Sequence, residues 1–476
     1  MPALCTPRSG GRGRPAGQFL LVLIAAVLLA AACSSPGKPA PAGPSATAAS
    51  TGPAKTVVPP GTPAGAQLRW LIAAAAHLPV SDAQVRAHFA VAILAQVSPA
   101  MINQALRAVT GAKLVSIQFS EPNVLLAIVS TSGVFPRAQV ELQVDSAGLI
   151  SNLPISPATL GPVPGTWAGV DAALRSVAPQ VRLLVANVSS GSCQPVHSMD
   201  PATPAPLGST SKLYVLDALG NAVASGKVRW NQPLTVTAQL KSMPGGQLQN
   251  EPDGTRISVQ DTAAYMIAIS DNTANDMLIN LLGRPAVEAA LTTTGMASPA
   301  LNRPFLTTRE FFTLKLHQWP ALANRYLAAN EAGRRALLAG TVDRAPLPGA
   351  AATQAWTAPR AVNSVDWFAS ADDICRLYAS LAALARRPGL TPIGHVLSLD
   401  GAGLALDPAL WKTTWVKGGS SEPEVLTLAY LATTRTGQSY VVTVLAENPS
   451  QPIDQNAVLP VMLSAIRGAF TLAARR

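Results

Sequence analysis

The sequence predicts an α+β protein with two folded domains that follow an N-terminal export signal. Residues 1–32 combine basic, apolar and small residues in the order typical of a leader, and a stretch poor in large apolar residues follows. Beyond it, helical runs precede strand-like runs in a first block, 67–157, whereas strand-like runs lie near both ends of a second block, 161–476, with helical runs between them. The chain has 476 residues, 48% of them apolar and 13% charged, which is enough for two or three domains with sizeable cores.

The leader has the features of a secretory signal. Three arginines precede an apolar run over residues 19–32, which is too short to span a membrane comfortably and ends at Cys33. A cysteine directly after three alanines is similar to a bacterial lipobox, although Ala30 stands where that motif usually has leucine. The resemblance implies that Cys33 is lipidated and holds the protein at the outer face of the cytoplasmic membrane. The alternative is a plain signal peptide with an incidental cysteine.

The segment after the leader, residues 33–66, is made mainly of Pro, Ala, Gly, Ser and Thr and predicts a disordered tether. The formal net charge of the whole chain is +10. Removal of the leader takes away three arginines and leaves about +7. We find no Lys- and Arg-rich run with interleaved aromatic residues, so the sequence gives little support to a nucleic-acid partner.

The first block predicts a small domain in which helices come before an antiparallel sheet. QLRWLIAAAA has helical character, Ser81 and Asp82 can cap a second helix, and SPAMINQALRAV has a serine cap and helical apolar spacing. The runs KLVSIQF, NVLLAIVS and AQVELQVD then predict strands separated by turns. No catalytic grouping is present, and His77 and His88 are interpreted as ordinary surface or core histidines.

The second block predicts one sheet assembled from both of its ends. A helix near 167–177 leads to the strand VRLLVANV and to CQPVHSM, with a hairpin between them. A helical middle covers about 259–385. The strands VLTLAYLATT and SYVVTVLAE follow, joined by a turn at 435–437, and the helix PVMLSAIRGAF ends the chain. Helices between terminal strands are typical of an α+β domain.

Two cysteines remain once Cys5 leaves with the leader and Cys33 carries lipid. Cys193 and Cys375 lie 182 positions apart and show no diagnostic spacing. Export would permit a disulfide between them, and two separate buried thiols are the alternative. The sequence predicts no metal site and no cofactor.

The chemistry of the chain centres on Ser209 and Lys212, in PAPLGSTSKLYVLDALG. Residues three apart on a helix share a face, so the lysine amine can reach the serine hydroxyl. A buried lysine with a lowered pKa can take the proton that a serine must lose to become a nucleophile. The helix N-terminus adds free N–H groups, one of which, that of Ser209, could form half of an oxyanion hole. Alone the pattern is weak, because a capping serine and a snorkelling lysine would give it too.

Two further motifs strengthen this interpretation. Ser270, Asp271 and Asn272 open the stretch SDNTANDMLINLLG, and Lys417 begins KGGSSEPEVLTLAYL. The order S-x-x-K, S-D-N, K-[TS]-G resembles the serine β-lactamase and penicillin-binding superfamily, and the 61 positions between Ser209 and Ser270 resemble its class A members. The resemblance covers most of 161–470 and implies a class A β-lactamase-like domain, in which an antiparallel sheet flanked by helices adjoins an all-helical subdomain.

The resemblance also implies a role for each residue that matches the motifs. Ser209 would be the acylated nucleophile, Lys212 its base directly or through a water, and Ser270 the relay that protonates the leaving group. Asn272 would bind Lys212 and the substrate amide, and Lys417 would hold Ser270 and a substrate anion. The third motif continues along the strand beside the cleft with Gly418, Gly419 and Ser420, whose N–H would be the second oxyanion donor. Asp271 is interpreted as a capping or structural aspartate.

Two departures from the superfamily pattern affect the expected activity. Gly418 stands where a hydroxyl normally helps to bind a substrate carboxylate, which weakens the case for β-lactams, though Ser420 or Ser421 could substitute. No clear E-x-x-x-N signature supplies the glutamate that activates the deacylating water. Glu310 and Glu331 are weak candidates, and each is interpreted as an ordinary helix-surface glutamate. The 147 positions between the second and third motifs indicate an insertion at about 301–366.

A narrower resemblance covers the chain from about residue 67 to its end. RWLIAA, AHFA, LAQVSPAMINQAL, GSTSKLYVLDAL, MPGGQLQNEPDGT, WFASADDICRLY and WVKGGSSEP are similar to LpqF-type actinobacterial lipoproteins and to the two-domain β-lactamase-like proteins of clavulanic acid gene clusters. That family implies a cystatin/NTF2-like first domain, similar to steroid isomerases and polyketide cyclases. It also implies a second domain with little or no β-lactamase activity and at most esterase-type activity.

These observations lead to one main functional hypothesis and two alternatives. The main hypothesis is an exported, lipid-anchored serine hydrolase that acts through a Ser209 acyl-enzyme on a small-molecule or cell-wall-derived ester or amide. The first alternative is a true β-lactamase or a D,D-peptidase, and Gly418 argues against both. The second is a non-catalytic envelope binding protein, and the intact set of Ser209, Lys212, Ser270 and Lys417 argues against it.

Overall fold

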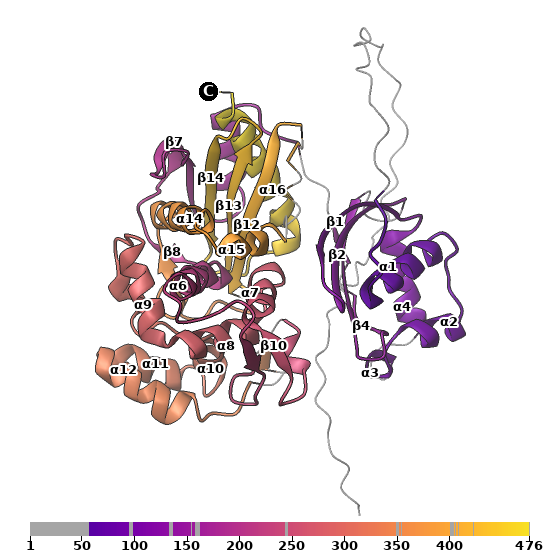
Figure 1. The fold of residues 1–476 in the computed structure, drawn as a ribbon, viewed down its shortest axis with the longest axis horizontal. Coiled ribbons are helices and arrows are strands. Elements are labelled where there is room, and N and C mark those ends of the chain that lie inside the picture. Colours follow the sequence, from indigo (N-terminus) through magenta and orange to yellow (C-terminus); the bar gives the residue numbers. More distant parts are fainter. Residues whose placement is uncertain are drawn as a thin grey trace, which may run out of the picture.

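The computed structural model describes residues 57–476 except 95–98, 133–136, 154, 158–161, 243–245, 349–351, 354, 400–403, 405, 408, 422 and 476. The leader, the tether and Cys33 therefore lie outside the described residues. The described chain forms two bodies of secondary structure, a smaller one before residue 158 and a larger one after residue 161 (Figure 1). No described helix has the length and apolar character needed to cross a membrane.

The first domain packs its helices against one face of an antiparallel sheet, as the sequence predicts. The helices are α1 (Pro63–Ala74), α2 (Asp82–His88), α3 (Val91–Leu94) and α4 (Pro99–Leu106), and the strands are β1 (Lys113–Ser120), β2 (Val124–Ser130), β3 (Arg137–Val144), β4 (Ile150–Asn152) and β5 (Ile155–Pro157). The order is β1-β2-β3-β4, with β5 paired to β3. Ser81 caps α2 through a reciprocal capping box with Gln84. Leu68 and Leu71 of α1 are buried with Leu125 of the sheet and form the core of this domain.

The second domain is built on one five-stranded antiparallel sheet that joins both ends of the block. Its order is β12-β13-β14-β6-β7, with β6 (Gln180–Asn187), β7 (Gln194–Met199), β12 (Trp411–Ser421), β13 (Val425–Thr434) and β14 (Ser439–Glu447). β6 pairs with β14 from Tyr440 opposite Asn187 to Glu447 opposite Gln180. The predicted assembly of the sheet from the two ends is confirmed.

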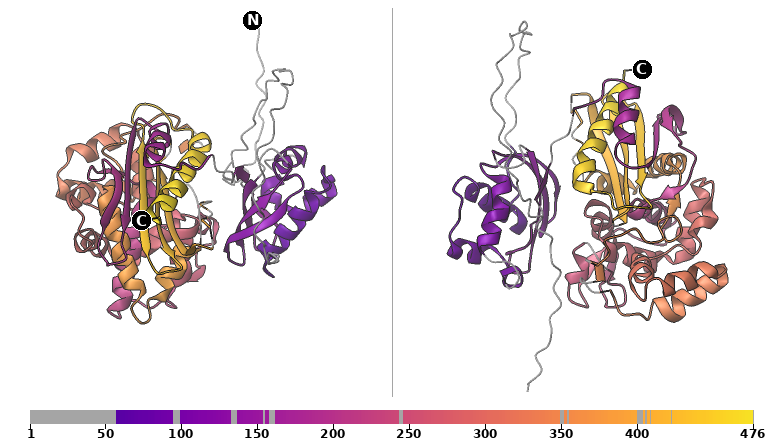
Figure 2. Two further views of the ribbon diagram at one scale, coloured as in Figure 1. Left: turned by 90° about the horizontal axis from the view of Figure 1, so that it is seen from above. Right: turned by 180° about the vertical axis from the view of Figure 1, so that it is seen from behind.

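Helices cover both faces of this sheet, which explains the uninterrupted apolar runs of its strands. Along β6, Leu183 and Val185 point into the core beneath α5 (Trp167–Arg175) and α16 (Gln455–Ala473), whereas Leu184 points into the core beneath α6 (Lys212–Ala224) and α14 (Ala371–Ala385). Figure 2 shows α16 lying along the outer face of the sheet. Neighbouring residues on a strand point to opposite faces, so two separate cores form on the two sides of one sheet.

The remaining helices form a helical region below the sheet in Figure 1. They are α7 (Val259–Ala268), α8 (Asn272–Leu282), α9 (Arg284–Thr293), α10 (Thr308–Leu316), α11 (Ala321–Ala328), α12 (Glu331–Leu337) and α15 (Thr391–Ser398). Every residue of α6 from 212 to 220 is buried, so this helix lies inside the domain between sheet and helices. The sequence did not predict the two short ribbons of this domain, which pair β8 (Ala205–Pro206) with β11 (Phe368–Ala369) and β9 (Pro233–Thr235) with β10 (Arg256–Ser258).

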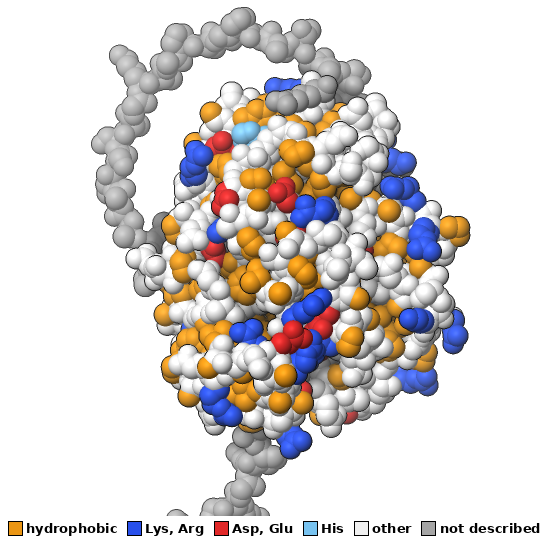
Figure 3. Space-filling model, turned by 90° about the vertical axis from the view of Figure 1, so that its left-hand side faces the viewer, with side chains coloured by type: hydrophobic (Ala, Val, Ile, Leu, Met, Phe, Trp, Pro, Cys, Tyr) orange, Lys and Arg blue, Asp and Glu red, His pale blue; other side chains and the backbone are white. Residues whose placement is uncertain are grey.

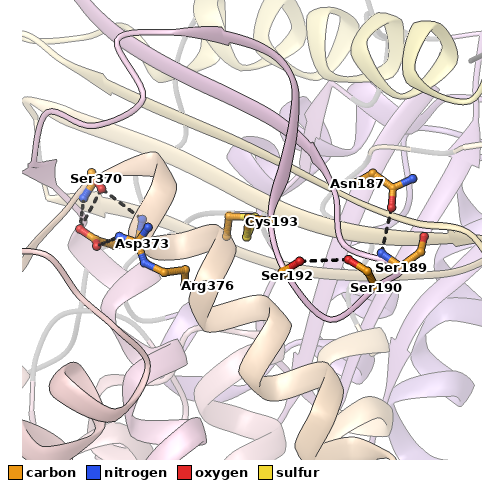
Figure 4. Close-up of a disulfide and its surroundings, with 9 residues drawn as sticks. Asn187, Ser189, Ser190, Ser192, Cys193, Ser370, Asp373 and Arg376 are labelled. Atoms are coloured by element: carbon orange, nitrogen blue, oxygen red, sulfur yellow. Dashed lines mark hydrogen bonds and ion pairs between the residues drawn. A yellow bond between two sulfur atoms is a disulfide. The ribbon is translucent and has the colours of Figure 1, made fainter.

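A disulfide joins Cys193 and Cys375, with Cα atoms 6.2 Å apart. It connects the turn before β7 to the second turn of α14 (Figure 4). Of the two states that the sequence left open, the structure contains the bridge. The N-terminus of α14 lies nearby in the same view, where Ser370 and Asp373 form a capping box and Asp373 pairs with Arg376. The bridge thus attaches an edge hairpin of the sheet to a helix of its inner face.

The two domains meet through a small apolar cluster. Phe119, Val124 and Leu126 of the first sheet are buried together with Ala268, the last residue of α7. β1 and β2 face the second domain in Figure 1. On the outer face of the molecule drawn in Figure 3, charged side chains of both signs are spread among apolar and uncharged ones.

Asp217 supplies a stability prediction, because it is a carboxylate inside the buried helix α6. It accepts hydrogen bonds from Ser380 Oγ at 2.7 Å and Asn221 Nδ2 at 2.9 Å, yet burial raises its pKa to about 6. A raised pKa means that the folded state binds the proton more tightly than the unfolded chain, so the free energy of unfolding falls as pH rises from about 4 to about 6. Asp217→Asn should remove this loss and stabilise the protein by about 2 kcal/mol at pH 8.

Urea unfolding of this variant at pH 5 and pH 8 measures the effect. Asp82→Asn, on the exposed first turn of α2, is the control and should leave the pH dependence unchanged. A loss of stability at pH 8 in Asp217→Asn would show instead that the two hydrogen bonds require a carboxylate.

Candidate active site

The proposed nucleophile lies where the sequence predicts it, at the entry to the buried helix. Ser209 belongs to the single turn Gly208–Ser211, which runs directly into α6 at Lys212. Gly208 has φ +50°, a left-handed conformation that glycine adopts at little cost, and this turns the chain sharply into the helix. Ser209 is half-buried, and its hydroxyl makes no hydrogen bond with any described residue. The hydroxyl is therefore free to react.

Lys212 is buried, with 1% of its surface exposed, and its amine is held by the second motif. Nζ donates to the carbonyl oxygen of Ser270 at 2.6 Å and to Asn272 Oδ1 at 2.7 Å, and it lies 3.3 Å from Ser270 Oγ. Burial first, and then the charge of Lys417, lower the pKa of Lys212 well below that of a free lysine. A neutral amine can accept a proton, so this lysine has the electrostatic property required of a general base.

Ser270 lies between two lysines. It occupies the break between α7 and α8 with φ +58°, a left-handed conformation that non-glycine residues rarely adopt. Its Oγ accepts a hydrogen bond from Lys417 Nζ at 3.0 Å and lies within reach of Lys212 Nζ. The unusual backbone conformation thus places one hydroxyl between the amines of the first and third motifs. The side chains of Lys212, Ser270 and Lys417 are therefore contiguous in space.

Asp271 has the structural role that the sequence indicates. It caps α8, accepting from the N–H of Ala274 with Oδ1 and from the N–H groups of Gln247 and Leu248 with Oδ2. It is completely buried, and burial raises its pKa while these N–H groups lower it. The aspartate anchors the loop at 247–248 against the start of α8. Because Asp271 stands between Ser270 and Asn272, its bonds also fix the backbone that carries these two residues.

Two glycines allow the nucleophile turn to touch strand β12. A Cβ atom added to Gly419 would lie 2.2 Å from the carbonyl oxygen of Leu207 and 2.6 Å from the nitrogen of Thr210. A Cβ on Gly208 would lie 2.7 Å from the carbonyl carbon of Ser420. Backbone therefore contacts backbone here, and the main chain around Ser420 lies directly beside the turn that carries Ser209. At Gly418, by contrast, the nearest atom to an added Cβ is the end of the Leu428 side chain at 3.3 Å.

Family comparison agrees with this geometry. Residues 168–341, which include the first two motifs, match the model described as the β-lactamase enzyme family. The second domain belongs to the β-lactamase family. Residues 59–150 match a second model, described as the N-terminal region of the ORF 12 gene product. The resemblance noted from the sequence is thereby confirmed for both domains.

Solved structures similar to the chain include several β-lactamases and a penicillin-binding protein. A β-lactamase from Sphaerobacter thermophilus is 18% identical, with a TM-score of 0.46 and coverage of 65% of this chain and 98% of its own. PBP-A is 19% identical, with a TM-score of 0.43 and coverage of 66% and 100%. A β-lactamase from Chitinophaga pinensis is 16% identical, with a TM-score of 0.45 and coverage of 64% and 98%. No curated protein matches the chain.

The two glutamates considered for the β-lactamase-family domain have different surroundings. Glu331 is exposed in the first turn of α12 and pairs with Arg335, as expected of a surface glutamate. Glu310 is completely buried, so its interpretation as a helix-surface residue is wrong. It closes a capping box with Thr307 and forms a two-pronged ion pair with Arg284. The sequence T-x-x-E before an apolar run is the signal that could have revealed this capping role.

Sequence reasoning missed a second group of buried charges beside the site. Lys315 and Glu424 form an ion pair at 3.1 Å with neither side chain exposed, and burial raises the pKa of Glu424 to about 7. Asp366 is 5% exposed and binds the backbone of the nucleophile turn. The sequence features that could have revealed this group are a lone lysine in the apolar run FFTLKL and a lone aspartate in VDWFA. Among the described residues, no group of three His, Cys, Asp or Glu side chains is arranged to hold a metal ion.

Proposed function

We propose that the β-lactamase-family domain is a serine hydrolase that forms an acyl-enzyme at Ser209. The observation that carries this proposal is the buried amine of Lys212, which is held against Ser270 and Asn272 and whose pKa is well below the usual value. A buried lysine is costly for stability unless it is paired or functional, and the charge with the largest effect on the pKa of Lys212 is that of another lysine, which outweighs either Asp271 or Asp276. A general base that removes the proton of Ser209 accounts for both features.

The proposed reaction uses the described side chains in order. Lys212, as a neutral amine, takes the hydroxyl proton while Ser209 Oγ attacks the substrate carbonyl carbon. The N–H groups of Ser209 and Ser420 stabilise the negative charge that forms on the carbonyl oxygen. Ser270 donates its proton to the leaving group and recovers one from Lys212 or Lys417, which both lie within 3.3 Å of its Oγ. Water then attacks the acyl-enzyme and releases the carboxylic acid and free Ser209.

The substrate we propose is a small-molecule or cell-wall-derived ester or amide, with esterase-like turnover and weak or no β-lactamase activity. Gly418 provides no hydroxyl for a substrate carboxylate, the group that β-lactams and peptide termini share. The carboxylate of Glu310 is occupied by Arg284 and Thr307, which disfavours it as a free base for the deacylating water. Both features argue against the alternative of a true β-lactamase or D,D-peptidase. The buried Lys212 argues against a purely binding role.

We also propose the location and the partners of the protein. Lipidation at Cys33 would hold it at the outer face of the membrane, with residues 33–66 as a tether and no nucleic-acid partner. The Cys193–Cys375 bridge supports an oxidising compartment, where disulfides persist. For the first domain we propose the cystatin/NTF2-like fold of steroid isomerases and polyketide cyclases, since its helices cover one face of a curved antiparallel sheet.

Intact-protein mass spectrometry tests the proposed function. Residues 57–476 would be incubated with a fluorophosphonate, with a panel of β-lactams and with simple acetyl esters, and ester hydrolysis would be followed in parallel. We expect a single fluorophosphonate adduct and ester turnover, both absent in Ser209→Ala and both retained in Ser225→Ala, at the exposed far end of α6. A stable β-lactam adduct would show that deacylation is the slow step. Labelling that persists in Ser209→Ala, or no adduct and no turnover in the wild type, would contradict the proposal.

A further inference from the structure

Asp366 binds both of the segments whose backbones touch at Gly208 and Gly419, namely the nucleophile turn and strand β12. Its Oδ1 accepts hydrogen bonds from the N–H of Gly208 at 2.9 Å and from the N–H of Leu207 at 3.2 Å, directly before the proposed nucleophile. Its Oδ2 accepts a hydrogen bond from Ser421 Oγ, directly after Ser420 on β12. One carboxylate therefore holds the residue before Ser209 with one oxygen and the residue after Ser420 with the other.

We propose that Asp366 is a positioning residue that sets the spacing between the two backbone donors of the oxyanion hole. This inference rests on the proposed function, in which those donors are the N–H groups of Ser209 and Ser420. Each donor is one residue from a group that Asp366 binds, so a change at the carboxylate is transmitted through a single peptide unit. An oxyanion hole stabilises charge only if its donors are correctly placed before the charge develops, which makes such a bridge important for rate.

The surroundings of Asp366 keep the carboxylate in one place. It is 5% exposed, and the N–H of its neighbour Trp367 adds a further hydrogen bond to Oδ1 at 2.7 Å. The Trp367 ring stacks on Phe311 at 5.0 Å, and its Nε1 donates to the carbonyl oxygen of Leu306. Burial raises the pKa of Asp366, whereas the charge of Lys315 and the bonds from Ser421 and the backbone lower it. Three N–H donors on one oxygen and a hydroxyl on the other are the partners that suit an ionised carboxylate.

Thr427 also connects the nucleophile turn to β12, but it binds different atoms from those that Asp366 binds. Thr427 Oγ1, on β13, lies 2.9 Å from the carbonyl oxygen of Leu207, 3.2 Å from that of Gly419 and 2.7 Å from Thr210 Oγ1. These bonds fix carbonyl oxygens and a side chain. The side-chain bonds to the N–H of Gly208 and to the Ser421 hydroxyl come from Asp366, whereas the N–H of Leu207 also donates to the carbonyl oxygen of Trp367 at 2.8 Å. The residues next to the two proposed donors are therefore held by this carboxylate.

Two variants separate positioning from folding. Ser421→Ala removes the bond on the strand side and leaves the bonds to Leu207 and Gly208 intact. Asp366→Asn keeps the shape and an acceptor oxygen but loses the charge. Ser398→Ala, which removes an exposed hydroxyl bonded within α15, is the control. The measurements are kcat and KM for an acetyl ester, Kd for phenylboronic acid, which forms a tetrahedral adduct on an active serine, and Tm.

We expect Ser421→Ala to lower kcat by about 10- to 100-fold and to raise Kd for phenylboronic acid by a similar factor. KM for the ester and Tm should stay close to the wild type, because ground-state binding does not use the developing charge. Asp366→Asn should show the larger loss of kcat.

Wild-type kcat and wild-type boronate affinity in Ser421→Ala would overturn the inference. So would a loss of kcat that merely follows a lower Tm with unchanged boronate affinity, since that is a structural role. If the wild type itself neither turns over ester nor binds boronate at Ser209, the proposed function fails first, and this outcome is recognisable without any variant.

Discussion

Replacement of Lys212 by methionine is expected to lower the rate of Ser209 acylation by about 10³-fold, in the range found for the loss of a general base. Methionine has similar length and suits an apolar site, so the helix should remain folded while the proton acceptor disappears. In the wild type, acylation should increase with pH as Lys212 loses its proton. Because burial and Lys417 lower the pKa of Lys212, this increase should occur well below the pH range in which a free lysine titrates.

The rate of fluorophosphonate labelling, measured from pH 5 to pH 10, checks both parts of this expectation. Lys227→Met, on the exposed turn after α6, is the matched control and should label like the wild type. Lys212→Arg should not rescue the reaction, because a guanidinium stays protonated at every pH used. Labelling of Lys212→Met at the wild-type rate would mean that another group takes the proton. A wild-type profile that increases only near pH 10.5 would mean that Lys212 titrates as an ordinary lysine and would favour the binding role.

Replacement of Gly419 by alanine is the second change expected to have a large effect. The new Cβ would lie 2.2 Å from the carbonyl oxygen of Leu207 and 2.6 Å from the nitrogen of Thr210, and neither backbone atom can rotate away. Strand β12 and the nucleophile turn must therefore separate. We expect a loss of about 1–3 kcal/mol in the free energy of unfolding, as for other overpacked sites. A displacement near 1 Å should also lower kcat by about 10²-fold.

Gly418→Ala is the matched control, one residue earlier on the same strand. Its Cβ would meet the movable end of the Leu428 side chain at 3.3 Å, so a small adjustment is enough. Urea unfolding and ester hydrolysis, measured on both variants, decide the matter. Equal stability and equal kcat in Gly419→Ala and Gly418→Ala would show that β12 and the nucleophile turn are not in backbone contact.

The sequence could predict the parts of the site that depend on short motifs. Ser209 and Lys212 share one turn, and Ser270 and Asn272 begin a helix, so local spacing already determines which side chains lie together. The sheet was predictable because apolar runs of strand length stand at both ends of the block. Two-residue strands such as β8 and β11 have no periodicity to detect, and they pair residues about 160 positions apart.

The supporting charges could not be predicted from the sequence for a different reason. Asp366, Lys315 and Glu424 come from three separate segments, and each is a single charged residue in an apolar surrounding. Only the tertiary fold shows that Lys315 pairs with Glu424 and that Asp366 binds the nucleophile turn. The Cys193–Cys375 bridge is similar, because two cysteines without a spacing pattern can pair only where the fold brings them together.

The pairing of β6 with β14 has a consequence for how the protein is made. β6 ends at Asn187 and its partner begins at Ser439, so the central ladder of the sheet joins parts of the chain that the ribosome releases far apart in time. Such non-local contacts are slow to form, because a long loop must close first. Until residue 447 has emerged, the edge of β6 that pairs with β14 has no complete partner strand. The second domain is therefore expected to need a chaperone until residue 447 has been made, because its central ladder cannot be completed earlier.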